Sequence, residues 1–145
     1  MKINKTASAI WNGGLKDGKG TISTESGALA NHPYGFNTRF EGVKGTNPEE
    51  LIGAAHAGCF TMALSMILGE AKLTATKMET KSQVTLEKKG DGFEITEIHL
   101  TLKGSVPGAT QAQFQELANK AKENCPVSKL FKSNAKITME AMLDN

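Results

Sequence analysis

A long apolar helix predicted after Asn47 constrains the fold of this 145-residue chain more than any other feature. Asn47 is suited to cap the helix, Pro48 suits the first helical position, and Glu50 lies three residues after the cap. Gly69 is suited to end it. From 51 to 68 the residues are apolar or small on nearly every face, which predicts a helix buried on all sides. A domain this small has little room to surround such a helix, so we expect a second subunit to cover it.

The first 45 residues predict a β arm. They contain eight of the fifteen glycines, and residues 6–11 and 20–26 have strand character on either side of a glycine-rich turn. Residues 36–41 read as a further short alternating strand that carries Arg39. Since the arm has few large apolar residues, we expect it to complete its sheet against a partner subunit. The chain is predicted to be a single domain, 1–145, with 1–45 as this arm.

The rest of the chain alternates strands and helices. Two long alternating strands, 77–89 and 93–104, flank the hairpin sequence Gly90-Asp91-Gly92. A helix capped by Thr110 should end at Asn124, because Pro126 lacks an N–H and restricts the residue before it. A short helix at 127–131 and a strand at 135–143 follow. The predicted class is α+β.

Composition narrows the possible functions. The net charge is +2, and the lysines are scattered, which gives little support for nucleic-acid binding. The N-terminus lacks the apolar region of a signal peptide, and polar residues interrupt the longest apolar segment. We therefore expect a soluble cytoplasmic protein with no membrane partner. In that compartment a disulfide is more typical of catalysis or redox sensing than of a permanent cross-link.

Two thiols and one guanidinium are the candidates for chemistry. Cys59 lies on the long helix and Cys125 before Pro126 at a helix break, and they are the only cysteines. A thiol on a rigid element and another on an adjustable turn suit a peroxidase in which one reacts and the other resolves. A buried thiolate requires a nearby cation. The only arginine, Arg39, could supply it, oriented by Glu49 or Glu50.

Other interpretations of the two cysteines remain open from the residues alone. Cys59 could be an inert core residue, as free cysteines in buried helices usually are. Cys125 could cap the next helix and be the reactive thiol itself, since a helix N-terminus favours a thiolate. Alternatively, it could cap that helix without reacting.

Histidines offer a further possibility. His56 lies three residues before Cys59, so a Cys-His hydrolase pair has to be considered, but no oxyanion-hole signature accompanies it. We expect His56 to be packed or hydrogen-bonded. No residue spacing matches a known metal motif, so no metal is expected.

Two segments resemble one known family. NPEELIGAAHAGCF, with Glu49 ten positions before Cys59, and NCPVSK around Cys125 are similar to the two cysteine motifs of the osmotically inducible protein C and organic hydroperoxide resistance proteins. The resemblance spans the chain. The position of Arg39 in FNTRF, after HPYG, is more similar to the osmotically inducible branch. The resemblance implies that Cys59 is the peroxidatic thiol, Cys125 the resolving thiol, and Arg39 with Glu49 the activating pair.

The resemblance also implies an architecture and a reaction. It implies an intertwined homodimer with two long central helices wrapped by antiparallel sheets. It implies a thiol-dependent peroxidase that reduces organic hydroperoxides, and hydrogen peroxide less well, through a Cys59 sulfenic acid and a Cys59–Cys125 disulfide. A dithiol or a lipoyl-bearing protein would be the reductant, and no cofactor is needed. The alternative is a non-enzymatic peroxide sensor or small-ligand-binding dimer.

The spacing of Glu49 and Cys59 indicates which subunit supplies the activating pair. Ten residues of one continuous helix cover roughly 15 Å at about 1.5 Å per residue. A glutamate side chain cannot cover that distance. If Glu49 and Arg39 act on Cys59, we expect them to come from the partner subunit.

Overall fold

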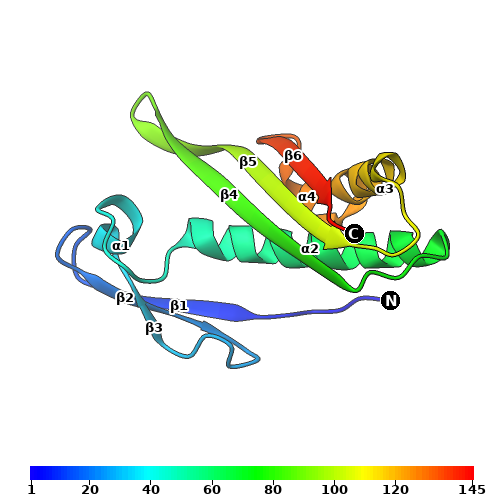
Figure 1. The fold of residues 1–145 in the computed structure, drawn as a ribbon. Helices are drawn as coiled ribbons and strands as arrows, with labels where there is room; N and C mark the ends of the chain where they lie inside the picture. The colour runs from blue at the N-terminus through cyan, green and yellow to red at the C-terminus, as the bar shows by residue number, and fades with distance from the viewer. The chain divides into compact units, whose positions relative to one another are not determined.

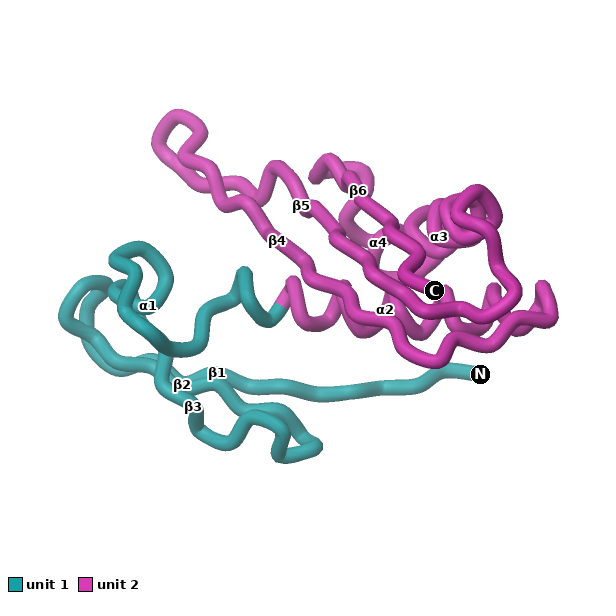
Figure 2. The backbone as a smooth tube through the Cα atoms, viewed as in Figure 1, with its two compact units in different colours: residues 1–51 teal, residues 52–145 magenta.

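The computed structural model describes residues 1–145, which form two compact units, Met1–Leu51 and Ile52–Asn145 (Figure 2). Helices and strands are both present, which confirms the α+β class (Figure 1). The elements are β1 (Ala7–Asn12), β2 (Lys19–Thr24), β3 (His32–Tyr34), α1 (Phe36–Phe40), α2 (Pro48–Glu70), β4 (Lys77–Lys89), β5 (Gly92–Ser105), α3 (Gln111–Asn124), α4 (Pro126–Phe131) and β6 (Lys136–Leu143).

The first unit contains a three-stranded antiparallel sheet in the order β1-β2-β3. Gly20 lies where the rings of Trp11 and Tyr34 meet, with centroids 5.5 Å apart. A β-carbon at Gly20 would lie 2.6 Å from the Trp11 ring, so glycine is required there. Every residue of β1 is exposed, in line with the few large apolar residues of the arm.

The segment expected as a third strand at 36–41 is the helix α1, and that prediction was wrong. Helical geometry brings Phe36 and Phe40, four residues apart, to a ring separation of 5.0 Å. The Thr38 hydroxyl accepts a hydrogen bond from the Gly35 N–H at 3.0 Å, which stabilises the first turn. The third strand is instead β3.

Helix α2 begins as predicted and runs without a break to Glu70. The Asn47 side chain accepts a hydrogen bond from the Glu50 N–H at 2.9 Å, which confirms its role as the cap. Phe60 and Leu64 are buried, but Met62 is 75% exposed. Complete burial of the helix is therefore not reached within one chain. By length and composition α2 could also cross a membrane, a test that core helices of soluble proteins pass as well.

The second unit buries its core between the helices and one face of the sheet β4-β5-β6. Ile98, Leu100 and Leu102 alternate along β5 and face this core. Phe60 of α2 and Phe114 of α3 belong to the same cluster. The sheet thus fixes α2 and α3 on the same side, and both thiols lie at this packing.

The hairpin and the helix end of the second unit are those predicted from the sequence. β4 and β5 form the expected hairpin, in which Gly90 adopts a positive φ of 60°. β6 runs parallel to β5, because α3 and α4 carry the chain back across the sheet. The Thr110 side chain caps α3, which ends at Asn124 as predicted.

Candidate active site

Arg39 and Glu49 form a two-pronged ion pair in the first unit. The Arg39 Nε donates to Glu49 Oε1 at 3.0 Å, and Nη2 donates to Oε2 at 2.9 Å. This is the planar fork that arginine offers and lysine lacks. The Arg39 side chain keeps 37% of its surface exposed, whereas Glu49 keeps 13%. The pair therefore leaves part of the guanidinium accessible to a further anion.

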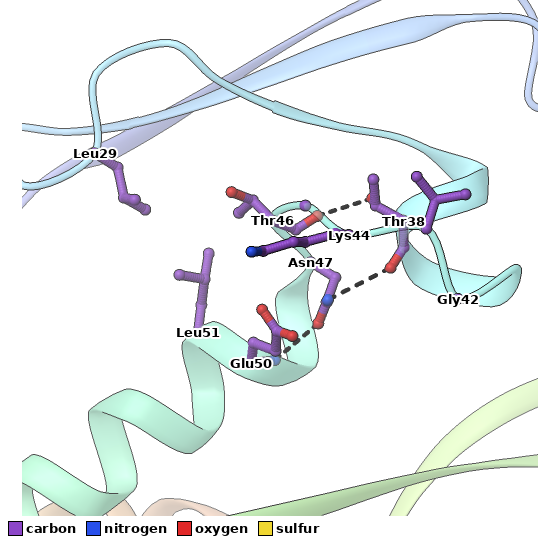
Figure 3. A pocket seen from close by; sticks show the side chains of 10 residues that line it. Leu29, Thr38, Gly42, Lys44, Thr46, Asn47, Glu50 and Leu51 are labelled. Carbon is purple, nitrogen blue, oxygen red and sulfur yellow. Dashed lines mark hydrogen bonds between the residues drawn. The ribbon is translucent and has the colours of Figure 1, made fainter.

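Hydrogen bonds of Thr38 and Asn47 hold the loop between α1 and α2 in place (Figure 3). The Thr38 hydroxyl donates to the Thr46 carbonyl at 2.9 Å, and the Asn47 amide reaches the Thr38 carbonyl at 3.5 Å. Asn47 also caps α2 through the Glu50 N–H. Because Thr38 precedes Arg39 and the cap lies two residues before Glu49, these bonds fix both ends of the ion pair.

An aromatic hollow of about 190 Å³ borders Arg39. Its wall includes Trp11, Tyr34, Phe36 and Phe40, and the guanidinium carbon of Arg39 lies 5.3 Å from the Phe40 ring centroid. The hollow combines an apolar lining with a single cationic group. Such a site suits an apolar molecule that carries a polar or anionic end.

Cys125 is fully buried at the junction of α3 and α4 in the second unit. It ends α3 and also caps α4, as considered from the sequence: its sulfur accepts a hydrogen bond from the Ser128 N–H at 3.3 Å. Its backbone N–H donates to Ala121 and its carbonyl accepts from Lys129. Pro126 suits the first position of α4, because a backbone N–H at that position would have no partner within the helix. The thiol is thus held by a fixed backbone.

Cys59 lies on α2, partly buried, and its thiol interacts with that of Cys125. Burial raises the pKa of Cys59, the thiol of Cys125 raises it further, and a hydrogen bond with the Val127 backbone lowers it. Both cysteines are free thiols. The structure therefore brings together two reduced thiols, of which Cys59 is the more exposed.

His56 is packed and hydrogen-bonded, as expected. It is fully buried on α2, its Nε2 lies 2.7 Å from the Ser128 Oγ, and burial lowers its pKa. Its hydrogen bond thus runs to a serine of α4. Ser128 was missed by the sequence interpretation, although its place three residues after Cys125 is the spacing at which a cap contacts a helix.

The structure thus forms two of the expected pairs, each within its own unit: Arg39 with Glu49, and Cys59 with Cys125. Glu50, the other candidate partner of Arg39, contributes its N–H to the Asn47 cap. No three His, Cys, Asp or Glu side chains gather in an arrangement that could hold a metal ion.

Comparison with known proteins gives consistent matches. Residues 41–140 match the family model described as OsmC-like protein. The sequence is 55% identical to peroxiredoxin OsmC of Escherichia coli over 143 residues, 99% of either chain. The crystal structure of the organic hydroperoxide resistance protein OhrB of Bacillus subtilis aligns with a TM-score of 0.70 at 32% identity, covering 94% of this chain and 97% of that one. An OsmC-like protein of Mycoplasma pneumoniae, 17% identical, has the same fold, with a TM-score of 0.78 over the whole of both chains.

Proposed function

This chain belongs to the OsmC-like protein family, and from that premise we propose that it is a thiol-dependent peroxidase that reduces organic hydroperoxides to alcohols. The observation that carries the proposal is that the only two cysteines of the chain, Cys59 and Cys125, are free thiols that lie at the same core, close enough for the Cys125 thiol to raise the pKa of Cys59. Two neighbouring thiols provide the two electrons that a peroxide takes up. The name of the Escherichia coli relative, a peroxiredoxin, supports the same reaction.

The two thiols receive different roles because their accessibility differs. A peroxide has to reach the sulfur that attacks it, and Cys59 is partly exposed whereas Cys125 is fully buried. Cys59 is therefore the peroxidatic thiol and Cys125 the resolving thiol. The Cys59 thiolate attacks the outer peroxide oxygen, the O–O bond breaks, and the leaving alkoxide takes a proton to become the alcohol. Cys59 is left as a sulfenic acid.

The cycle closes through a disulfide. Cys125 attacks the sulfenic sulfur, the Cys59–Cys125 bond forms, and the hydroxyl leaves as water. A dithiol, free or carried as a lipoyl group on a protein, then reduces the disulfide by exchange. Neither step requires a cofactor.

Arg39 and Glu49 serve as the activating pair. Burial raises the pKa of Cys59, so a cation is needed to hold the thiolate. The guanidinium of Arg39 remains positively charged in apolar surroundings, and both carboxylate oxygens of Glu49 orient this guanidinium. The guanidinium also stabilises the negative charge that develops on the leaving oxygen. The aromatic hollow beside Arg39 suits the apolar part of an organic hydroperoxide better than it suits hydrogen peroxide.

We assign the covering of α2 to a second copy of the chain. The exposed face of the helix includes Gly58, Met62 and Met66, and the two methionines are 75% and 64% exposed. In an intertwined homodimer the two α2 helices would cover each other and the β arm would complete its sheet on the partner, so that 1–145 forms one domain. Since α2 is unbroken between Glu49 and Cys59, the activating pair would come from the partner subunit. The location would be the cytoplasm.

Steady-state turnover tests this proposal. The protein should consume cumene hydroperoxide through many cycles with dithiothreitol as the reductant, and use hydrogen peroxide less efficiently as judged by kcat/KM. Chromatography with light scattering should give the mass of a dimer. A single equivalent of peroxide consumed, followed by a stable disulfide that dithiols leave intact, would favour a sensor. Absence of any peroxide consumption would exclude the peroxidase.

A further inference from the structure

A buried histidine that the proposed cycle does not use lies beside the resolving thiol. His56 is fully buried, with its Nε2 2.7 Å from the Ser128 Oγ and its ring edge against Phe131, 6.3 Å between centroids. Its other nitrogen, Nδ1, is buried and has no hydrogen-bond partner. A buried polar atom without a partner lowers stability, so this histidine costs the fold more than an apolar residue would. Packing alone does not account for it.

The hydrogen bonds continue from Ser128 to the sulfur of Cys125. The Cys125 thiol donates to the Ser128 Oγ at 3.2 Å, and the Ser128 N–H donates back to the sulfur at 3.3 Å. Ser128 is itself 1% exposed. Three residues from α2, α4 and the α3–α4 junction thus form one buried chain of hydrogen bonds that ends at a thiol.

We propose that His56, acting through Ser128, accepts the proton of Cys125 when this thiol resolves the sulfenic acid of Cys59. The inference rests on the proposed function, because it assigns Cys125 the resolving role. Ser128 touches the reacting sulfur, whereas His56 acts through Ser128 and is a positioning residue and proton acceptor. The arrangement places a base next to a thiol that solvent does not reach.

The proton balance closes within the site. The Cys125 proton passes to the Ser128 oxygen while the Ser128 hydroxyl proton passes to His56 Nε2, which leaves a thiolate and an imidazolium. The thiolate keeps the hydrogen bonds of the Ser128 N–H and hydroxyl. It attacks the sulfenic sulfur, the S–S bond forms, and the S–O bond breaks. The leaving hydroxide takes the proton back from His56 and departs as water.

His56 has the protonation state that this transfer needs. Burial lowers its pKa, so the ring is neutral near pH 7 and one nitrogen is free to accept. Burial is the only cause of that lowering, so no charged side chain of α2, α3, α4 or the sheet shifts it. The titratable group at the end of this hydrogen-bond chain is the thiol of Cys125, which lies near enough to Cys59 to raise the pKa of that thiol.

Rapid mixing with one equivalent of cumene hydroperoxide separates the two steps. The first, sulfenic acid formation, is read by dimedone trapping and mass spectrometry, and the second by disulfide formation. In His56→Gln and Ser128→Ala the second step should slow at least tenfold more than the first. His99→Gln is the matched control, because His99 also bonds a hydroxyl, Thr138 Oγ1 at 2.6 Å, but on β5. It should behave like the wild type.

The pH profile distinguishes a proton acceptor from a packing role. In the wild type the rate of disulfide formation should be nearly level from about pH 6.5 to 8, because neutral His56 takes the proton. In His56→Gln it should rise about tenfold per pH unit, since it then depends on hydroxide to form the thiolate. Equal rates and profiles in variant and wild type would overturn the relay and leave the peroxidase intact. A wild type that forms no disulfide would instead contradict the proposed function.

A measurement on the unsubstituted protein covers the case in which a variant does not fold. Nitrogen-15 NMR of histidine-labelled, reduced protein should show His56 protonated at Nδ1 and unprotonated at Nε2, the nitrogen that faces Ser128. Circular dichroism and thermal melting establish which variants are folded. A proton on Nε2 in the reduced wild type would overturn the relay, because Nε2 could not then accept from Ser128.

Discussion

The two Arg39–Glu49 hydrogen bonds, 3.0 Å from Nε and 2.9 Å from Nη2, join the guanidinium to both oxygens of the carboxylate. Two hydrogen bonds fix the orientation of the guanidinium relative to the carboxylate, whereas a single bond would fix only the distance between them. The remaining guanidinium surface is therefore presented in a defined direction, which is what an activating cation requires.

Arg39→Lys should slow peroxide attack by more than tenfold, about 1.4 kcal/mol in barrier, because an ammonium cannot hold carboxylate and sulfur in one fork. Stopped-flow measurement of the first oxidation step gives the rate. Lys120→Ala is the control, since it removes a cation that pairs with Glu116 on α3 and lines no part of the hollow. An Arg39→Lys rate within twofold of the wild type would refute the role of the fork.

The two cysteines should give opposite phenotypes. Cys59→Ser is expected to abolish peroxide reduction, whereas Cys125→Ser should consume one equivalent and accumulate a sulfenic acid that dimedone traps. Mass spectrometry of the oxidised wild type should show a Cys59–Cys125 disulfide. If the sulfenic acid formed on Cys125 in the Cys59→Ser protein, the roles would be reversed. Intact thiols after peroxide treatment would exclude the two-cysteine cycle.

Mixed dimers test whether the site is shared between subunits. Cys59→Ser and Arg39→Ala proteins, each expected to be inactive, are unfolded and refolded together. The heterodimer should regain activity, because one of its two sites then combines an intact Cys59 with an intact Arg39 of the partner. Each protein refolded alone is the control. Verified heterodimers that remain inactive would show that each chain builds its own site.

Stability should depend on His56 in weakly acidic solution. Burial lowers the pKa of His56 from 6.5, so the unfolded chain binds its proton at a higher pH than the folded chain does. The free energy of unfolding should fall as the pH drops below about 6.5 and through the lowered folded pKa. His56→Gln should lose that part of the dependence, and His99→Gln should keep it. Urea titrations at pH 7.5 and 5.5 measure the difference; identical slopes in all three proteins would contradict it.

Local patterns were enough to predict most of the elements. The Asn47-Pro48 start of α2, the turn at Gly90 and the end of α3 before Pro126 each depend on residues within a few positions of one another. Arg39 was placed on a strand because α1 has only five residues, and its conformation depends on Thr38 bonding to Gly35 and Thr46. Such tertiary bonds are not visible in a short alternating pattern.

The residues of the candidate site could be predicted from the sequence, but most of the contacts between them could not. Arg39 stood out as the only arginine, yet the residues alone left Glu49 and Glu50 as equal partners. Helix geometry decides between them, since Asn47 takes the Glu50 N–H and the Glu49 carboxylate meets the fork. Ser128 and His56 are separated by 72 positions, and only the packing of α4 against α2 brings them together.

Cys125 ends one helix and starts the next, and both of its backbone polar groups are hydrogen-bonded, to Ala121 and Lys129. These two hydrogen bonds anchor the main chain of Cys125, and neither of them involves the sulfur. The sulfur on this anchored residue is hydrogen-bonded to Ser128 and lies close enough to Cys59 to raise the pKa of that thiol. Disulfide formation at this junction would therefore need little of the loop rearrangement that limits turnover in many enzymes.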